Sequence, residues 1–317
     1  MKRAIVPILV MFLTCGIAGA VTGLLLDRQS SQSVPVKPAP IAKESNTVSY
    51  KGVSFTFDRS LASEIESETI PANVDGKPCD IVPEHLAFTL VGYPRRRGMP
   101  DNDPHIRVFR ITKFREAVSV ASKENAKSVV YPPNPPDWTT YFDEEVRTLR
   151  AMIAERPSLS NLKSFVVKTR RDRDNTQMPF LPMWEATQAF VSHVRYLNFK
   201  NGKGIFFLTQ WDTETSQITN EGLEYAFQGI TNDGQYYVYA QFSVTAPFLP
   251  QVDEPDVVAW NEKNYLLPHK SKEYQTYLRP VLDKLEALPA NKFQPSLVLF
   301  EQLIGSLQIE TESPRKR

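Results

Sequence analysis

The sequence predicts an α+β fold in which helices pack against an antiparallel β-sheet. Two patterns indicate this class: segments of alternating apolar and polar residues joined by tight-turn signatures, and amphipathic helices that follow them at the end of the chain. Strands that come first in the chain and helices that come later are typical of α+β proteins. Strict alternation of strands and helices along the chain is typical of parallel sheets. A long uncharged segment at the N-terminus adds a membrane-anchor helix to the prediction.

The first predicted element of the folded part is a β-hairpin. In the sequence VSYKGVSFTFD, two β-rich runs flank Lys51 and Gly52, which form a compact turn signal. Further strands are expected at Leu86–Tyr93 and His105–Thr112, joined by a long polar loop. A short helix is expected after them, at Lys113–Ser122.

A longer amphipathic helix is predicted after the proline-rich break at residues 131–136. Its apolar residues recur at steps of three and four and form one stripe: Trp138, Phe142, Val146, Leu149 and Ile153. Asp137 is placed to cap the N-terminus of this helix. The acidic run at residues 143–145 is interpreted as its solvated side.

The strongest β signal is a meander over residues 186–246. Two of its turns carry the Asn-Gly or Asp-Gly signature of tight hairpins, at residues 201–202 and 233–234. Its last strand alternates with period two, as an antiparallel strand requires. One face carries Tyr236, Val238, Ala240, Phe242 and Val244, and the other carries Tyr237, Tyr239, Gln241 and Ser243.

The face with Tyr237 and Tyr239 has two interpretations. Tyrosines beside Gln241 are suited to line a ligand or protein surface, because tyrosine offers apolar area with a polar tip. The favoured interpretation is that a terminal helix covers this face. Both terminal helices have an apolar stripe that needs a partner.

Two amphipathic helices are predicted to close the chain. The first has a stripe of Tyr274, Tyr277, Leu278, Val281 and Leu285, with Pro280 expected to kink or restart it. The second follows Pro295 and has a stripe of Phe300, Leu303, Ile304 and Leu307.

The N-terminal segment is predicted to anchor the chain in a membrane. Residues 4–26 carry no charge and are long enough to span a bilayer, which needs about 20 residues. Lys2 and Arg3 precede them, which predicts a cytoplasmic N-terminus and an extracytoplasmic remainder. Two alternatives stay open: lipid attachment at Cys15, although FLT before it is a poor lipobox, and cleavage after residues 18–20.

The predicted organisation therefore has three parts. Residues 1–26 form the anchor or signal segment, and residues 27–46 form a flexible tether rich in Pro and Ser. Residues 47–317 form a single extracytoplasmic α+β domain. The formal net charge of +1 gives no electrostatic argument for a nucleic-acid partner.

Few residues point to chemistry. Asp101, Asp103 and His105 alternate in DNDPH and form a candidate site for a divalent metal, although a plain turn explains the same residue types. Cys79 is interpreted as a small buried residue, and His193 as a satisfied histidine of the sheet. No phosphate-binding loop, HExxH or GxSxG motif occurs, and no cofactor is expected.

The start VSYKGVSFTFD and the finish LFEQLIGSLQI resemble the first hairpin and last helix of the PsbP-like fold. This resemblance implies an antiparallel sheet sandwiched by helices. The extracytoplasmic part also resembles an uncharacterised family of bacterial secreted or membrane-anchored proteins. Both resemblances imply an accessory or binding module, and no functional residue carries over from them.

The sequence thus favours a membrane-anchored binding or accessory protein without catalytic activity, whose ligand or partner is not defined by any motif. The alternative is an extracytoplasmic hydrolase with a site that only the fold assembles. A deep pocket that joins Asp101, Asp103 or His105 to another carboxylate would favour the enzyme. A shallow aromatic face would favour the binding module.

Overall fold

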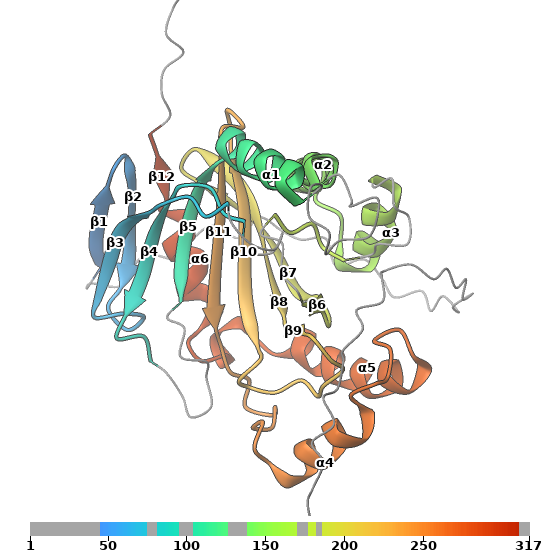
Figure 1. The fold of residues 1–317 in the computed structure, drawn as a ribbon. Helices are drawn as coiled ribbons and strands as arrows, with labels where there is room; N and C mark the ends of the chain where they lie inside the picture. Colours follow the sequence, from blue (N-terminus) through green and yellow to red (C-terminus); the bar gives the residue numbers. More distant parts are fainter. Residues whose placement is uncertain are drawn as a thin grey trace, which may run out of the picture. The chain divides into compact units, whose positions relative to one another are not determined.

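A seven-stranded antiparallel sheet lies at the centre of the computed structural model (Figure 1). The structure describes residues 45–74, 81–94, 104–125, 138–169, 177–181 and 186–310. The strands follow the order β3-β4-β5-β11-β10-β8-β7. In that order they span Glu64–Ile70, His85–Val91, His105–Arg110, Tyr236–Ser243, Glu224–Thr231, Gly202–Thr209 and Ser192–Phe199.

Local turn chemistry fixes the register of the hairpins. Gly234 has a φ of 71° in the turn between β10, which ends at Thr231, and β11, which begins at Tyr236. Lys51 and Gly52 have φ values of 46° and 80°, the left-handed region that a tight hairpin turn needs. The strands β7 and β8 also form a hairpin, with Phe199 paired to Gly202, so the three hairpins that the turn signatures predicted are confirmed.

Three helices cover one face of the sheet. They are α1 (Ile111–Asn125), α2 (Trp138–Glu155) and α3 (Leu159–Thr169). Their apolar side chains share a core with residues of β5, β8, β10 and β11 on that face, such as Phe109 and Phe207. Four residues of the predicted stripe of α2 are buried: Phe142, Val146, Leu149 and Ile153.

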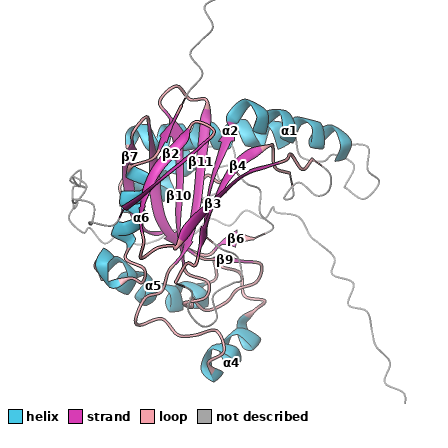
Figure 2. Ribbon diagram, turned by 90° about the vertical axis from the view of Figure 1, so that its left-hand side faces the viewer, coloured by secondary structure: helices cyan, strands magenta, loops and turns pink. Residues whose placement is uncertain are grey.

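Two helices and a small sheet cover the opposite face. The helices are α5 (Lys272–Ala287) and α6 (Leu297–Gly305), and their stripes pack in the second core. The hairpin β1 (Ser45–Tyr50) and β2 (Val53–Asp58) pairs with β12 (Gln308–Ile309) in a separate three-stranded sheet. Figure 2 shows α1 and α2 on one side of the large sheet and α6 on the other.

The remaining elements lie at one end of the large sheet (Figure 1). The short strands β6 (Thr187–Gln188) and β9 (Trp211–Asp212) pair with each other, and α4 (Pro255–Asn264) follows the large sheet in sequence. One compact unit, Val34–Arg317, contains every described residue. The α+β prediction is therefore confirmed.

Several predicted boundaries were wrong. The strand expected at His105–Thr112 ends at Arg110, because α1 begins at Ile111. The strand expected over residues 186–199 is divided into β6 and β7, and β7 has a bulge between Ser192 and Arg195. Pro280 lies inside α5 without ending it. The elements β3, α3 and α4 were not predicted from the sequence.

The predicted solvated side of α2 was wrong at one residue. Glu145 is 1% exposed, and its carboxylate accepts a hydrogen bond of 2.8 Å from the backbone N–H of Phe180. Its neighbour Asp143 does lie at the surface, where it pairs with Arg115 at 2.8 Å. Glu145 is buried in this helix interface because the buried backbone N–H of Phe180 needs a hydrogen-bond acceptor, which the carboxylate supplies.

The face with Tyr237 and Tyr239 is covered, but not by a terminal helix. Both tyrosines are buried in the core beneath α1 and α2, whereas α5 and α6 pack against the other face of β11. Phe180 also covers Tyr239, with ring centroids 5.2 Å apart. β11 is consequently buried on both faces rather than on one.

The predicted anchor, residues 1–26, lies outside the described residues, as does the tether up to residue 44. The last two residues assigned to the tether, Ser45 and Asn46, belong instead to β1. Within the part of the chain that the structure describes, no helix is long and apolar enough to cross a membrane.

Candidate functional site

A cavity of about 620 Å³ that is wide open to solvent lies beside β9. Residues 211–216 form one side of it, and Asn261, Glu262 and Tyr265 form the other side from α4 and its C-terminal end. Trp211 and Asp212 come directly after β8, where the chain leaves the large sheet and turns into a polar loop. The cavity is therefore made by β9, the polar loop that follows it, and α4 with its C-terminal end.

The lining is polar and acidic, with two aromatic rings. Asp212, Glu214 and Glu262 supply three carboxylates, and no lysine or arginine occurs among the lining residues. Trp211 and Tyr265 supply the rings. Such a mixture of apolar faces and a few convergent polar groups is typical of small-ligand sites.

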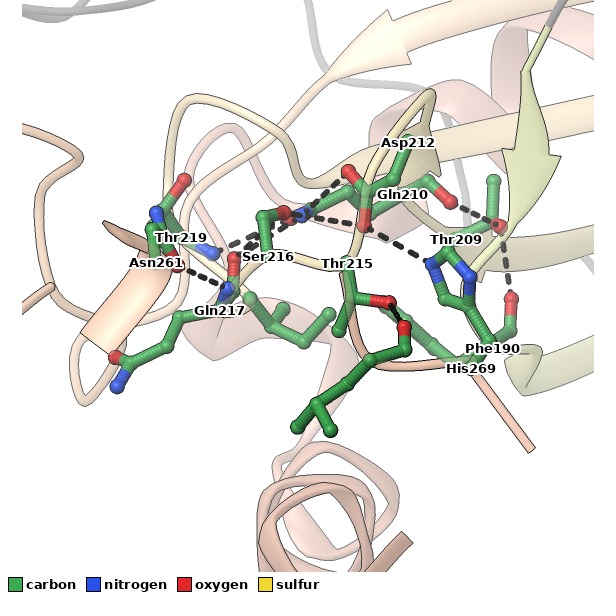
Figure 3. Close-up of polar contacts among 12 residues, drawn as sticks. Phe190, Thr209, Gln210, Asp212, Thr215, Ser216, Gln217, Thr219, Asn261 and His269 are labelled. Carbon is green, nitrogen blue, oxygen red and sulfur yellow. Dashed lines mark hydrogen bonds and ion pairs between the residues drawn. The ribbon is translucent and has the colours of Figure 1, made fainter. Parts of the chain in front are cut away.

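A buried amide organises the polar loop (Figure 3). Nε2 of Gln210 lies within hydrogen-bond distance of four acceptors: both carboxylate oxygens of Asp212, at 3.0 and 3.3 Å, Oγ of Ser216 at 3.0 Å and the carbonyl of Gln217 at 3.1 Å. Its two N–H groups are shared among these acceptors, and its Oε1 accepts from the backbone N–H of Thr219. One side chain thus fixes the loop from both of its ends.

Hydrogen bonds also join the two sides of the cavity. The backbone N–H of Gln217 donates to Oδ1 of Asn261 in α4 at 2.8 Å. The hydroxyl of Thr215 donates to the carbonyl of Leu267, and its backbone N–H donates to the carbonyl of Tyr265 at 3.4 Å. These bonds fix the width of the cavity without a ligand.

Asp212 lies in a polar cluster with the half-buried His269 and the buried Tyr274. Nε2 of His269 is 3.9 Å from Oδ2 of Asp212, and the His269 and Tyr274 rings are 5.3 Å apart. Burial and then the charge of Asp212 raise the pKa of the Tyr274 hydroxyl. Neither His269 Nε2 nor the Tyr274 hydroxyl has a hydrogen-bond partner among the described residues.

A second perturbed group, Glu224, lies behind the cavity. It begins β10 on the sheet face that carries Gln241 and Tyr239, next to Trp211. Burial raises the pKa of the Glu224 carboxyl to about 7, although Gln241 and Trp211 stabilise its charged form. A carboxyl that titrates near neutral pH next to a cavity is a functional-site signal.

Of the sequence-predicted metal site, the one described residue, His105, does not line this cavity. His105 lies at the start of β5, half-buried against the ring of Tyr239, while Asp101 and Asp103 lie outside the described residues. Among the described residues, no group of three or more His, Cys, Asp or Glu is arranged to hold a metal ion. Cys15 and Cys79 also lie outside the described residues.

The two buried histidines of the sheet have local structural partners. Nε2 of His193 is 2.9 Å from the carbonyl of Leu288, which confirms the interpretation of a satisfied histidine. Nδ1 of His85 is 2.8 Å from the carbonyl of Pro83, and its ring stacks on Phe109. Burial lowers the pKa of His85, which favours its neutral form.

The cavity residues were not predicted from the sequence, because no motif marks them. The only signal is the polar run DTETSQ directly after the apolar strand that ends at Trp211. A turn explains such a run equally well. Comparison with models of protein families, with curated proteins and with solved structures found no match to this chain.

Proposed function

We propose that this chain is a membrane-anchored extracytoplasmic binding or accessory protein whose ligand enters the cavity beside β9. The location rests on the sequence alone: Lys2 and Arg3 before the uncharged residues 4–26 favour an anchored chain with a cytoplasmic N-terminus. The binding role rests on the cavity. The PsbP-like resemblance, which implies an accessory module, agrees with this proposal.

The observation that carries the binding role is the pre-organised polar wall of the cavity. Gln210 holds Asp212 and Ser216 from behind, and Asn261 ties α4 to the loop. A site whose polar groups are already held loses little entropy when a ligand binds. The hydroxyl of Thr215 donates to a backbone carbonyl rather than to a base, an arrangement that suits a binding wall better than a nucleophile.

A ligand screen with matched tryptophan variants tests this proposal. The full chain in neutral detergent is heated with small polar compounds of positive, neutral and negative charge, and the shift in Tm is recorded. We expect at least one class to raise the Tm of the wild type and of Trp138→Ala, but not of Trp211→Ala. Trp138 begins α2, outside the cavity, and is the control for loss of a tryptophan.

A panel in which no compound raises the Tm of the wild type would contradict the proposal. The proposal would also be contradicted if each ligand raised the Tm of the wild type and of Trp211→Ala by the same amount.

One observation favours the hydrolase alternative. Glu224 has a pKa of about 7, which suits a general acid or base, and its sheet face also carries His105. Gln241 lies between them, because it pairs with His105 in β5 and with Ala226 in β10. Turnover of an ester, peptide, phosphate or glycoside substrate that is lost in Glu224→Gln would replace the binding proposal with this one.

A further inference from the structure

The charge of the cavity beside β9 restricts its ligand. Asp212, Glu214 and Glu262 line it, and the lining contains no lysine or arginine to balance them. Glu214 and Glu262 are exposed at the rim, whereas Asp212 is 8% exposed at the wall. An anion entering this cavity would be repelled, and a neutral ligand would desolvate carboxylates without compensating their charge.

The aromatic residues supply surfaces that a cation favours. The ring of Trp211 is held by Phe180, with centroids 4.6 Å apart, so its orientation is fixed before a ligand arrives. Tyr265, at the C-terminal end of α4, is 46% exposed and free to pack against a ligand from the other side. A cation over the face of an indole or phenol ring is attracted by the ring quadrupole.

The buried cluster behind Asp212 also suits a hydrogen-bond donor. Gln210 already donates to both oxygens of Asp212, and each carboxylate oxygen has capacity for a further donor. The Tyr274 hydroxyl is fully buried near Asp212 and lacks a hydrogen-bond partner among the described residues. Asp212 lines the cavity and therefore offers its carboxylate oxygens to an N–H group that reaches the wall, whereas Tyr274 is not among the lining residues.

We propose that the cavity beside β9 binds an organic cation, an ammonium or guanidinium group, between Trp211 and Tyr265 and among the three carboxylates. The group is either a free amine or a lysine or arginine side chain of a polypeptide, and the recognition chemistry is the same for both. This inference rests on the proposed binding function and names the class of ligand.

Calorimetric titration of the full chain in neutral detergent at 150 mM salt, an ionic strength that screens distant charges, tests the inference. The probes are spermidine, a trilysine peptide, a neutral disaccharide and citrate. The variant Glu214→Gln/Glu262→Gln removes the two rim charges. Both glutamates are exposed, and glutamine has nearly the same shape. The control Glu66→Gln/Glu68→Gln removes the same charge from exposed positions on β3.

We expect at least one of the two cations to bind, and the rim variant to weaken that binding by about tenfold, since two charge pairs are lost. The β3 control stays within about twofold of the wild type. Tighter binding of spermidine identifies a free amine as the ligand, and tighter binding of trilysine identifies a polypeptide; both support the inference.

Failure of both cations to bind, or equal weakening by the β3 control, overturns the inference. If the disaccharide or citrate then binds and loses affinity in Trp211→Ala, the binding function stands and only the ligand class is wrong. If no probe and no compound of the wider thermal screen binds, the proposed function fails as well.

Discussion

At the scale of single residues, Glu224 shows how burial changes the chemistry of an ordinary side chain. Its carboxyl lies in the sheet beside Trp211 and Gln241, and burial raises its pKa to about 7. Tyr239, on the same face, is buried as well, and burial raises the pKa of its hydroxyl well above the usual range. Glu224 is therefore neutral at mildly acidic pH and gains its negative charge as pH rises through about 7.

The first prediction concerns the pH dependence of stability. In the folded state Glu224 keeps its proton up to a pH of about 7, whereas an unperturbed carboxyl loses it above 4.5. Between these values the folded state binds more protons, so this group's contribution to the free energy of unfolding falls as pH rises. Glu224→Gln should remove that fall and be more stable than wild type at pH 8, by on the order of 3 kcal/mol.

Urea unfolding of both proteins between pH 4 and pH 8 checks this expectation. The difference in stability between variant and wild type should grow across the interval. A difference that is constant with pH would mean that Glu224 titrates at its usual pKa.

The second prediction concerns the core. Phe242 is fully buried, as the alternation of its strand predicted, and its ring stacks on Phe300 of α6 at 4.3 Å. Phe242→Ala should lower the free energy of unfolding by about 3–5 kcal/mol, because it leaves a cavity between β11 and α6. Val120→Ala, at a position that is 48% exposed on α1, is the control and should change it by less than about 0.5 kcal/mol.

At the scale of elements, the sequence was informative where a pattern is local. The hairpin turns and the stripes of α2, α5 and α6 were predictable, because Asn-Gly signatures and three–four periodicity need no tertiary contact. The missed helix α3 has the same three–four spacing, with Leu159, Leu162 and Val166 in the core, and was overlooked. The missed elements β3 and α4 lack such patterns. β3 carries exposed glutamates at alternate positions, as edge strands do, and α4 buries only Val257.

The third prediction concerns the contact between β8 and β10. A Cβ on Gly204 would lie 2.3 Å from the Phe227 ring and 2.5 Å from the carbonyl oxygen of Gln228. Gly204→Ala should therefore push the two strands apart and lower stability by about 1–3 kcal/mol. Gly305→Ala, where a Cβ meets nothing within 4 Å, is the control and should leave stability unchanged or slightly higher. Equal Tm values for both variants would show that the strands adapt without cost.

At the scale of the whole molecule, the fold class was predictable but the site was not. The cavity joins residues 211–216 to Asn261, Glu262 and Tyr265, which lie about 50 residues further along the chain. Only the packing of α4 against the loop after β9 brings them together. DNDPH, the one cluster visible in the sequence, contributes no described residue to that cavity.

The fourth prediction concerns location. Because basic residues precede the uncharged segment 4–26, the N-terminus should lie in the cytoplasm and the α+β domain outside it. A reporter that is active only outside the cytoplasm, fused after Arg317, should be active. A silent reporter would refute this topology, and acyl-chain labelling that disappears in Cys15→Ser would identify a lipoprotein instead.

Ligand binding in the cavity beside β9 can be observed at Trp211 itself by ¹⁹F NMR of the fluorotryptophan-labelled full chain. The chain has four tryptophans, and each resonance is assigned by a Trp→Phe variant. On titration with the compound that raises the Tm most, the Trp211 resonance should shift to saturation while that of Trp138 in α2 stays unchanged. A Trp211 resonance that does not move, while the compound still stabilises the protein, would contradict ligand binding in this cavity.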